Sequence, residues 1–150
     1  MIDVQQILSE ELNTLKSDII IRHEASGQKA SGKTEQGFEI VVSGSVGQLL
    51  GYSYVGVLGT GRRPGKVPTE FVDILKRWAQ AKGINFSNEK QFTIWANAVK
   101  WKIIREGTKL YRSGIHQDIF ETPIENLKSR LSSRISELMS IEIANEIFKQ

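Results

Sequence analysis

The eleven residues from Leu58 to Pro68, LGTGRRPGKVP, constrain the fold of this chain more than any other stretch. Five of them are glycine or proline, and three are basic. Glycine loses the most backbone entropy on folding, and proline lacks the N–H that a helix interior or a central strand needs. The stretch therefore predicts an irregular basic arm over residues 59–68, whose geometry is set by Gly59, Gly61, Pro64, Gly65 and Pro68.

The same stretch fails the spacing of both common phosphate-binding motifs. A Walker loop has Gly, four residues, then Gly-Lys-Ser/Thr, but Thr60 stands at the first glycine and Val67 at the hydroxyl position. A dinucleotide-binding fingerprint that starts at Gly59 needs Gly or Ala at position 64, which is proline here. No cofactor is expected.

The overall composition is that of a soluble globular protein, with 39% hydrophobic and 25% charged residues among 150. No apolar run approaches the roughly 20 residues of a membrane helix, and the first residues lack the basic-then-apolar pattern of a signal peptide. The chain has no cysteine and only two histidines. Disulfides and a metal site are therefore not expected, and a reducing compartment suits the composition.

Charge is unevenly distributed along the chain. Residues 62–112 carry twelve basic and four acidic side chains, a net charge of +8. Residues 1–61 carry four basic and seven acidic side chains, and residues 113–150 carry four and six, giving −3 and −2. Three interpretations follow: contact of the basic block with nucleic acid, pairing with an acidic face of a neighbouring copy, or simple solvation of a helical segment.

Periodicity predicts an N-terminal helix and a small antiparallel sheet. Apolar residues at helical spacing favour a helix from Asp3 to about Glu24, with Asp3 as its cap. The glycine-containing polar segment 26–37 predicts a mobile loop. Alternation over 38–42 predicts a strand, and glycines 44 and 47 a turn. The run 48–58 suits either a bulged strand or a short helical turn, because Gly51 and Gly56 interrupt it.

Three further helices are predicted after the arm: 69–82, stopped by Gly83; 87–105, with a Ser87 cap; and 122–148, with a Thr122 cap and Pro123 in its first turn. Residues 108–119 are expected to connect the last two. Apolar residues surround most of the second of these helices, which predicts contact on two sides. At ~1.5 Å per residue the last helix is about 35–40 Å long. The expected fold class is α+β, in one domain over residues 1–150.

No catalytic set assembles from the acidic residues and histidines. Three carboxylate pairs are close enough to consider as acid and base: Glu10 with Glu11, Glu70 with Asp73, and Glu121 with Glu125. Each lies at a helix start or on a predicted solvated face, where a structural role is favoured. A surface role is also favoured for His116, which lies two residues before Asp118 with no other histidine nearby. No catalytic or metal-binding residue is assigned, and the chain is not expected to be an enzyme.

The three tryptophans lie among basic residues of the predicted helices. Trp78 and Trp95 fall on apolar helix faces, so packing in the core is favoured over stacking on nucleic-acid bases. Trp101 lies off the main apolar stripe of its helix. Because tryptophan often dominates the binding energy of interfaces, Trp101 is predicted to be an interface anchor.

Residues 52–112 together resemble the tail-completion or head–tail joining family, minor structural proteins that complete the neck of tailed bacteriophages. The resemblance rests on an aromatic run into Gly59-Thr60-Gly61, the basic arm, Trp78-x-x-x-x-Gly83-Ile84, and Arg105-Glu106-Gly107-Thr108. The segment Asp118 to Pro123 stands where the family has an aromatic-Pro start to its last helix. Two features depart from the family pattern: Val57 occupies a position where relatives often carry an acid, and loop 26–37 follows the usual Thr-Gly pattern only loosely.

The resemblance implies a non-catalytic protomer of a homo-oligomeric ring, of about six or twelve copies, with DNA passing through its lumen. Its partners would be portal or adaptor proteins and the adjacent tail ring, in the virion after assembly in the host cytoplasm, without a membrane. The arm and the turn 107–114 would supply contacts to subunits, partners or the DNA channel through Arg62, Arg63, Lys66, Trp101, Lys109 and Arg112. The alternative is a small basic nucleic-acid-binding module that uses residues 62–112.

Overall fold

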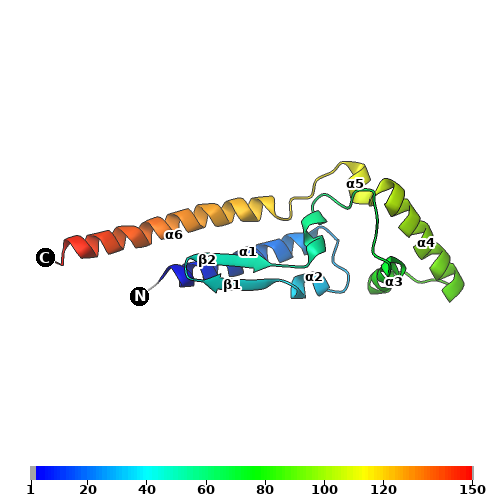
Figure 1. Ribbon diagram of the computed structural model, residues 1–150, viewed down its shortest axis with the longest axis horizontal. Helices are drawn as coiled ribbons and strands as arrows, with labels where there is room; N and C mark the ends of the chain where they lie inside the picture. The colour runs from blue at the N-terminus through cyan, green and yellow to red at the C-terminus, as the bar shows by residue number, and fades with distance from the viewer. Residues whose placement is uncertain (1–2, 150) are drawn as a thin grey trace.

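The computed structural model describes residues 3–149 as two groups of packed elements that the arm joins (Figure 1). Met1, Ile2 and Gln150, which belong to the predicted domain 1–150, lie outside the described residues. The helices are α1 (Val4–Ala25), α2 (Lys33–Gln36), a 3-10 helix η1 (Ser53–Val57), α3 (Phe71–Ala81), α4 (Glu89–Glu106), α5 (Lys109–Ser113) and α6 (Glu121–Ile147); the strands are β1 (Glu39–Ser43) and β2 (Val46–Leu50).

This element order confirms the predicted α+β class, with an N-terminal helix, a two-stranded antiparallel sheet, and then helices that end in a long C-terminal one. The expected connection 108–119 additionally contains the short helix α5. Glycine at position 114, with φ of +66°, ends α5 after little more than one turn. The segment 26–37 likewise contains the single turn α2.

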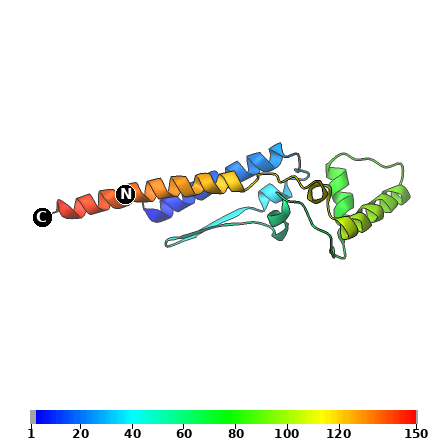
Figure 2. The same cartoon turned by 90° about the horizontal axis from the view of Figure 1, so that it is seen from above.

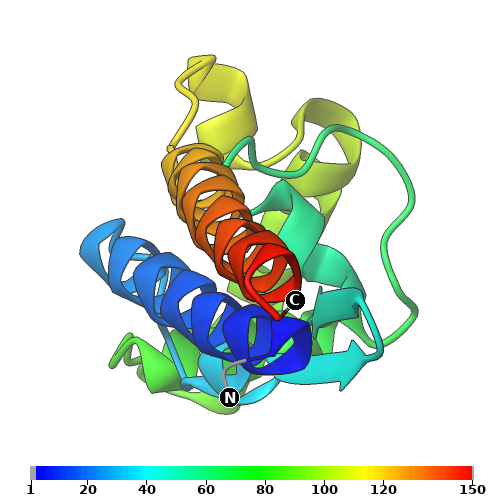
Figure 3. The same cartoon turned by 90° about the vertical axis from the view of Figure 1, so that its left-hand side faces the viewer.

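Helix α1 packs between the hairpin and α6, as the end-on view in Figure 3 shows. Because α1 has neighbours on two sides, its buried residues spread over more than one side of the helix. The main core lies at this junction and consists of Leu12, Leu15, Ile19, Phe38 and Ile119. Partly buried residues of the hairpin, of η1 and of α6 pack against that core. Residues from both ends of the sequence therefore share one hydrophobic cluster.

The hairpin follows the predicted alternation but turns earlier than predicted. Ile40 and Val42 face inward, and Glu39 and Val41 are exposed. β1 pairs with β2 from Glu39 opposite Leu50 to Ser43 opposite Val46, so Gly44 lies in the turn. Gly47 lies inside β2, and the prediction that it punctuates the turn was wrong. A Cβ at Gly47 would lie 2.7 Å from Leu12 Cδ1, so the missing side chain lets α1 approach the strand. Both alternatives for 48–58 are partly realised, since β2 ends at Leu50 and η1 follows.

Side-chain acceptors for first-turn N–H groups lie at the beginning of three helices. Asp3 Oδ1 accepts a hydrogen bond from Gln6 N at 2.7 Å, as predicted. The predicted Ser87 cap was wrong by one residue, because Asn88 Oδ1 accepts from Gln91 N at 2.9 Å. The predicted Thr122 cap was also wrong: α6 begins at Glu121, and Asp118 accepts from both the Thr122 N–H and the Thr122 hydroxyl. These hydrogen bonds, with Arg22 nearby, lower the pKa of the Asp118 carboxyl below its usual range.

Helices α3 and α4 pack together as the second group, away from the hairpin (Figure 2). Their buried residues are Leu75, Ala79, Phe92 and Ala96. The Phe86 ring extends this contact by stacking on Phe92, with centroids 4.5 Å apart. The prediction that Trp78 packs in a core was wrong, since 42% of that residue is exposed. Two helices alone bury only one face of each, and Trp78 lies outside that face.

An ion cluster joins α1 to α6. Glu11, which is buried, accepts hydrogen bonds from Arg130 Nε at 2.6 Å and from Arg134 Nη1 at 2.9 Å. Arg134 Nη2 also donates to Glu10 Oε2 at 2.6 Å. Glu10 is exposed, as predicted, but the prediction of a solvated face was wrong for Glu11. Burial alone would raise the pKa of Glu11, but the hydrogen bonds and charges of Arg130 and Arg134 outweigh it and lower that pKa.

Candidate interaction site

The basic arm is bound, from Gly59 to Gly65, to the end of α4 and to the segment that follows it. Arg62 N donates to Thr108 Oγ1 at 2.9 Å, and Thr108 N donates to Arg62 O at 2.9 Å. Gly65 N donates to Ile104 O at 3.0 Å, and Gln117 N donates to Gly59 O at 2.8 Å. We call residues 59–66 together with residues 104–117 the junction. The two segments that were predicted separately as contact regions are thus one structural unit.

Close approach within the junction explains three of its glycines. A Cβ at Gly61, where φ is +77°, would lie 2.5 Å from Tyr111 N and 2.6 Å from Thr108 Oγ1. A Cβ at Gly107, where φ is +80°, would lie 2.6 Å from Arg62 O, and one at Gly59 would lie 2.8 Å from Gln117 O. Real Cβ atoms do not approach other atoms so closely. Glycine is therefore required at these positions for the arm to contact the following segment.

The five cations predicted as contact residues in the arm and the turn lie together on the junction. Arg62 is engaged within it, since its guanidinium donates to Lys66 O and lies 5.8 Å from the centroid of the Phe71 ring. Arg63, Lys66 and Lys109 are exposed and form no ion pair within residues 3–149. Arg112 pairs with Glu106 at 3.1 Å. Residues 59–66 and 104–117 contain six arginines and lysines and one acidic residue, Glu106, so the junction is a cationic surface.

The sixth predicted contact residue, Trp101, lies on α4. Fifty-seven per cent of it is exposed, and the Lys100 ammonium lies 5.9 Å from the centroid of its ring. Ile94, two turns earlier on the same helix, is 60% exposed. This burial pattern agrees with a helix whose second apolar side has no partner among the described residues.

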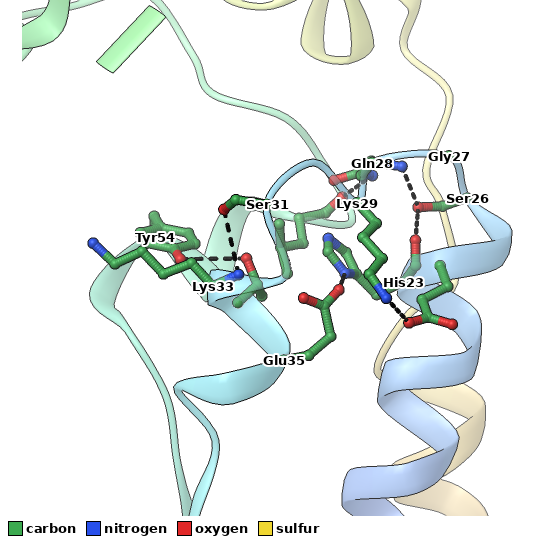
Figure 4. Close-up of polar contacts among 12 residues, drawn as sticks. His23, Ser26, Gly27, Gln28, Lys29, Ser31, Lys33, Glu35 and Tyr54 are labelled. Atoms are coloured by element: carbon green, nitrogen blue, oxygen red, sulfur yellow. Dashed lines mark hydrogen bonds and ion pairs between the residues drawn. The ribbon is translucent and has the colours of Figure 1, made fainter. Parts of the chain in front are cut away.

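The segment predicted as a mobile loop is tied to three other elements (Figure 4). His23 Nδ1 lies 2.6 Å from Glu35 Oε1; the His23 side chain is buried, and 11% of the Glu35 side chain is exposed. Gln28 Nε2 donates to Leu58 O at 2.7 Å, and Thr34 Oγ1 lies 3.3 Å from Tyr54 Oη. The mobility of the segment stays a prediction. Its contacts connect α1 with η1 and with Leu58, the residue before the junction.

The burial of two polar residues, Glu11 and His23, was not predicted from the sequence, although the spacing of each to apolar residues indicated it. Glu11 lies four residues after Ile7 and four before Leu15, and His23 lies four residues after Ile19. Residues at this spacing share a helix face, and Ile7, Leu15 and Ile19 are all buried. A polar residue on a buried stripe indicates specific partners, which are Arg130 and Arg134 for Glu11 and Glu35 for His23.

Replacement of Glu35 by alanine is expected to lower the free energy of unfolding by about 1–3 kcal/mol, because buried His23 would lose its hydrogen-bond partner. Urea denaturation of the purified protein measures this loss. Glu39→Ala is the matched control, since Glu39 is an exposed carboxylate on the following strand. An equal, small effect of both substitutions would contradict a structural role for the pair.

The remaining acid–base candidates form no shared centre. His116 Nε2 lies 3.5 Å from Glu121 Oε1 with both side chains exposed, while Asp118 pairs with Arg22 at 3.2 Å. Glu125 pairs with Lys128 at 2.8 Å. Glu70 and Asp73 lie exposed at the start of α3. Within residues 3–149, no group of three or more His, Asp or Glu side chains lies together as a metal site would require.

Helices long and apolar enough to span a bilayer are absent from the described part of the chain. No protein-family model, no curated protein and no solved structure matches the chain.

Proposed function

We propose that this chain is a ring-forming structural subunit of the head–tail connector of a tailed bacteriophage, located in the virion neck. The observation that carries the proposal is the junction. Two of the motifs behind the family resemblance, Gly59-Thr60-Gly61 and Gly107-Thr108, lie far apart in sequence and are brought together by the Arg62–Thr108 hydrogen bonds. The motif residues thus build one hydrogen-bonded unit that presents cations, and a charged surface of this kind suits an assembly contact.

The exposed apolar residues support an assembly role. Trp101 and Ile94 on α4, and Met139, Ile143 and Ile147 on α6, are each about half exposed or more. Side chains of this kind mark protein interaction surfaces when they gather on one face. We infer that neighbouring ring subunits and the adjacent portal-side and tail-side rings cover them during assembly in the host cytoplasm, while DNA passes through the lumen.

Reversal of charge at two exposed arm residues, Arg63→Glu with Lys66→Glu, is expected to block assembly of infectious particles. Arg62 is left unchanged because its side chain is held within the junction. Like charge placed against a complementary surface costs several kcal/mol at an interface, so particle titre should fall by about 100-fold or more. The measurement is the titre produced when the variant replaces the normal chain in a strain that makes the particles.

The matched control is Lys33→Glu with Lys128→Glu, which changes net charge equally at exposed lysines outside the junction. Thermal unfolding of both purified variants establishes that each retains its fold. Normal titre from the arm variant, with the variant chain present in the particles, would refute the assignment.

A second candidate, a small nucleic-acid-binding module, is favoured by one observation. Trp101 is exposed beside Lys100 and Lys102, which is the arrangement of an aromatic platform for base stacking. Micromolar or tighter binding of DNA by the isolated chain, with a steep dependence on salt, would favour this function. Weak binding without such dependence would favour the connector.

A further inference from the structure

The C-terminal end of α6 carries a face that is both apolar and acidic. Its residues recur at helical spacing and line one shallow groove: Met139, Glu142, Ile143, Glu146 and Ile147. Half or more of each isoleucine is exposed. Glu142 forms no ion pair within residues 3–149, and Glu146 pairs only with nearby Lys149. We call these five residues the acidic face.

Helix α4 carries a face of the opposite charge. At 3.6 residues per turn, Lys90, Ile94, Ala98, Trp101 and Arg105 lie on one stripe, and all five are exposed. This stripe is opposite to Phe92 and Ala96, which pack toward α3. Lys90 and Arg105 take part in no ion pair in the described part of the chain. We call these residues the basic face.

The two faces lie at opposite ends of the molecule. In both Figure 1 and Figure 2, the C-terminal end of α6 lies at one end of the long axis and α4 lies at the other. The faces therefore cannot meet within one chain. Pairing of like faces between two copies would place glutamates against glutamates, or cations against cations, and like charges oppose binding.

We propose that the acidic face of one copy binds the basic face of a second copy. Both faces have exposed apolar side chains, and the glutamates of the acidic face are opposite in charge to Lys90 and Arg105 of the basic face. Trp101 would be the buried aromatic anchor of this contact. A contact between different faces at the two ends of one protomer is heterologous, and it generates a closed ring when the rotation between copies allows. The inference rests on the proposed connector function and names the next copy as the partner of each face.

The test uses two charge-reversed variants of the full chain. One is Glu142→Lys with Glu146→Lys, which makes both faces basic; the other is Lys90→Glu with Arg105→Glu, which makes both faces acidic. Sedimentation velocity at low salt measures the mass of each. The normal chain should associate, and each variant alone should associate at least ~30-fold more weakly because like charges now meet. An equimolar mixture should recover association, since its contacts alternate in charge.

Matched controls are available on α6 itself. Glu125→Lys with Glu137→Lys adds the same charge, and Glu137 lies about 140° around the helix from Glu142. This control should associate normally. Ile143→Ala should weaken association by about tenfold, whereas Ile141→Ala, at an equally exposed isoleucine on another side of α6, should not.

Three results would overturn the inference: a normal chain that stays monomeric to millimolar concentration, single variants that associate normally, or a mixture that fails to recover. Loss of duplex-DNA binding by the Lys90 and Arg105 variant, without any change in mass, would identify the basic face as a nucleic-acid surface and would also overturn it. Failure of the proposed function is distinguishable. If the two variants associate when mixed but the phage particles do not contain the chain, the connector function is wrong and the contact between the two faces stands. If the particles contain the chain but the mixed variants do not associate, the connector function stands and the contact between the two faces is wrong.

Discussion

Gly61→Ala is expected to lower the free energy of unfolding by about 3 kcal/mol, because it combines backbone strain with a steric clash. Gly61 has φ of +77°, a conformation that side chains disfavour. The added Cβ would lie 2.5 Å from the backbone nitrogen of Tyr111, which cannot move away as the end of a flexible side chain could. The arm would have to separate from the following segment, and the paired Arg62–Thr108 hydrogen bonds would be lost.

Urea denaturation compares this variant with Gly56→Ala. Gly56 lies in η1, its φ is not positive, and a Cβ there would meet nothing within 4 Å. The control should therefore change stability by no more than about 0.5 kcal/mol. Similar small losses in both variants would mean that the arm is not held against residues 104–117. Because the junction carries the proposed function, Gly61→Ala should also reduce particle formation at temperatures where the control is normal.

Local patterns were sufficient to predict most elements of this fold. The four long helices and the first strand follow from hydrophobic spacing and from glycine stops such as Gly83 and Gly107, with helix starts wrong by one or two residues, whereas the short helix α5 was not predicted. The acceptor roles of Asn88 and Asp118 were missed because Ser87 and Thr122, which lie nearby, are also residue types that favour the start of a helix. Choice between them depends on backbone geometry that a residue pattern does not contain.

Contacts between distant segments were not predictable from these patterns. The arm and the segment after α4 were each identified in the sequence. Their contact with each other depends on the absence of a Cβ atom at positions 59, 61 and 107, which the patterns did not show. Trp78 was expected in a core because its helix is amphipathic. The apolar stripe of α3 is wider than the area that α4 covers, so Trp78 stays exposed. A sequence does not show how many neighbours a helix has. For the same reason, the sequence did not show that the apolar residues at the end of α6 have no cover within residues 3–149.

Removal of the negative charge in Glu11→Gln is expected to lower the free energy of unfolding at pH 7 by about 2–3 kcal/mol. The substitution leaves Arg130 and Arg134 facing a neutral amide in the contact between α1 and α6. Breaking a fully buried pair costs about 3–5 kcal/mol. Because about a third of each arginine side chain is exposed, water can solvate part of the unpaired charge, which reduces the expected loss.

The effect of Glu11→Gln should depend on pH in a defined direction. The pKa of Glu11 in the folded chain lies below its ordinary value of 4.5, so the folded state binds a proton less readily than the unfolded state. The stabilisation is therefore complete above pH 4.5 and is lost as pH falls through the folded pKa. The stability difference between the normal chain and Glu11→Gln, measured by urea denaturation, should be largest near pH 7 and should narrow toward pH 3. Glu10 and Asp118, whose pKa values are also lowered, are present in both proteins.

Glu39→Gln is the control, since Glu39 is exposed on β1 and forms no ion pair in the described part of the chain. Its stability should match that of the normal chain at every pH. A gap for Glu11→Gln that stays constant from pH 7 to pH 3 would indicate that shape, and not charge, holds α1 against α6. A stability difference that narrows toward pH 3 means that the ion pairs of Glu11 with Arg130 and Arg134 hold α1 against α6. The same ion pairs would then fix the position of α6, whose C-terminal end carries the acidic face.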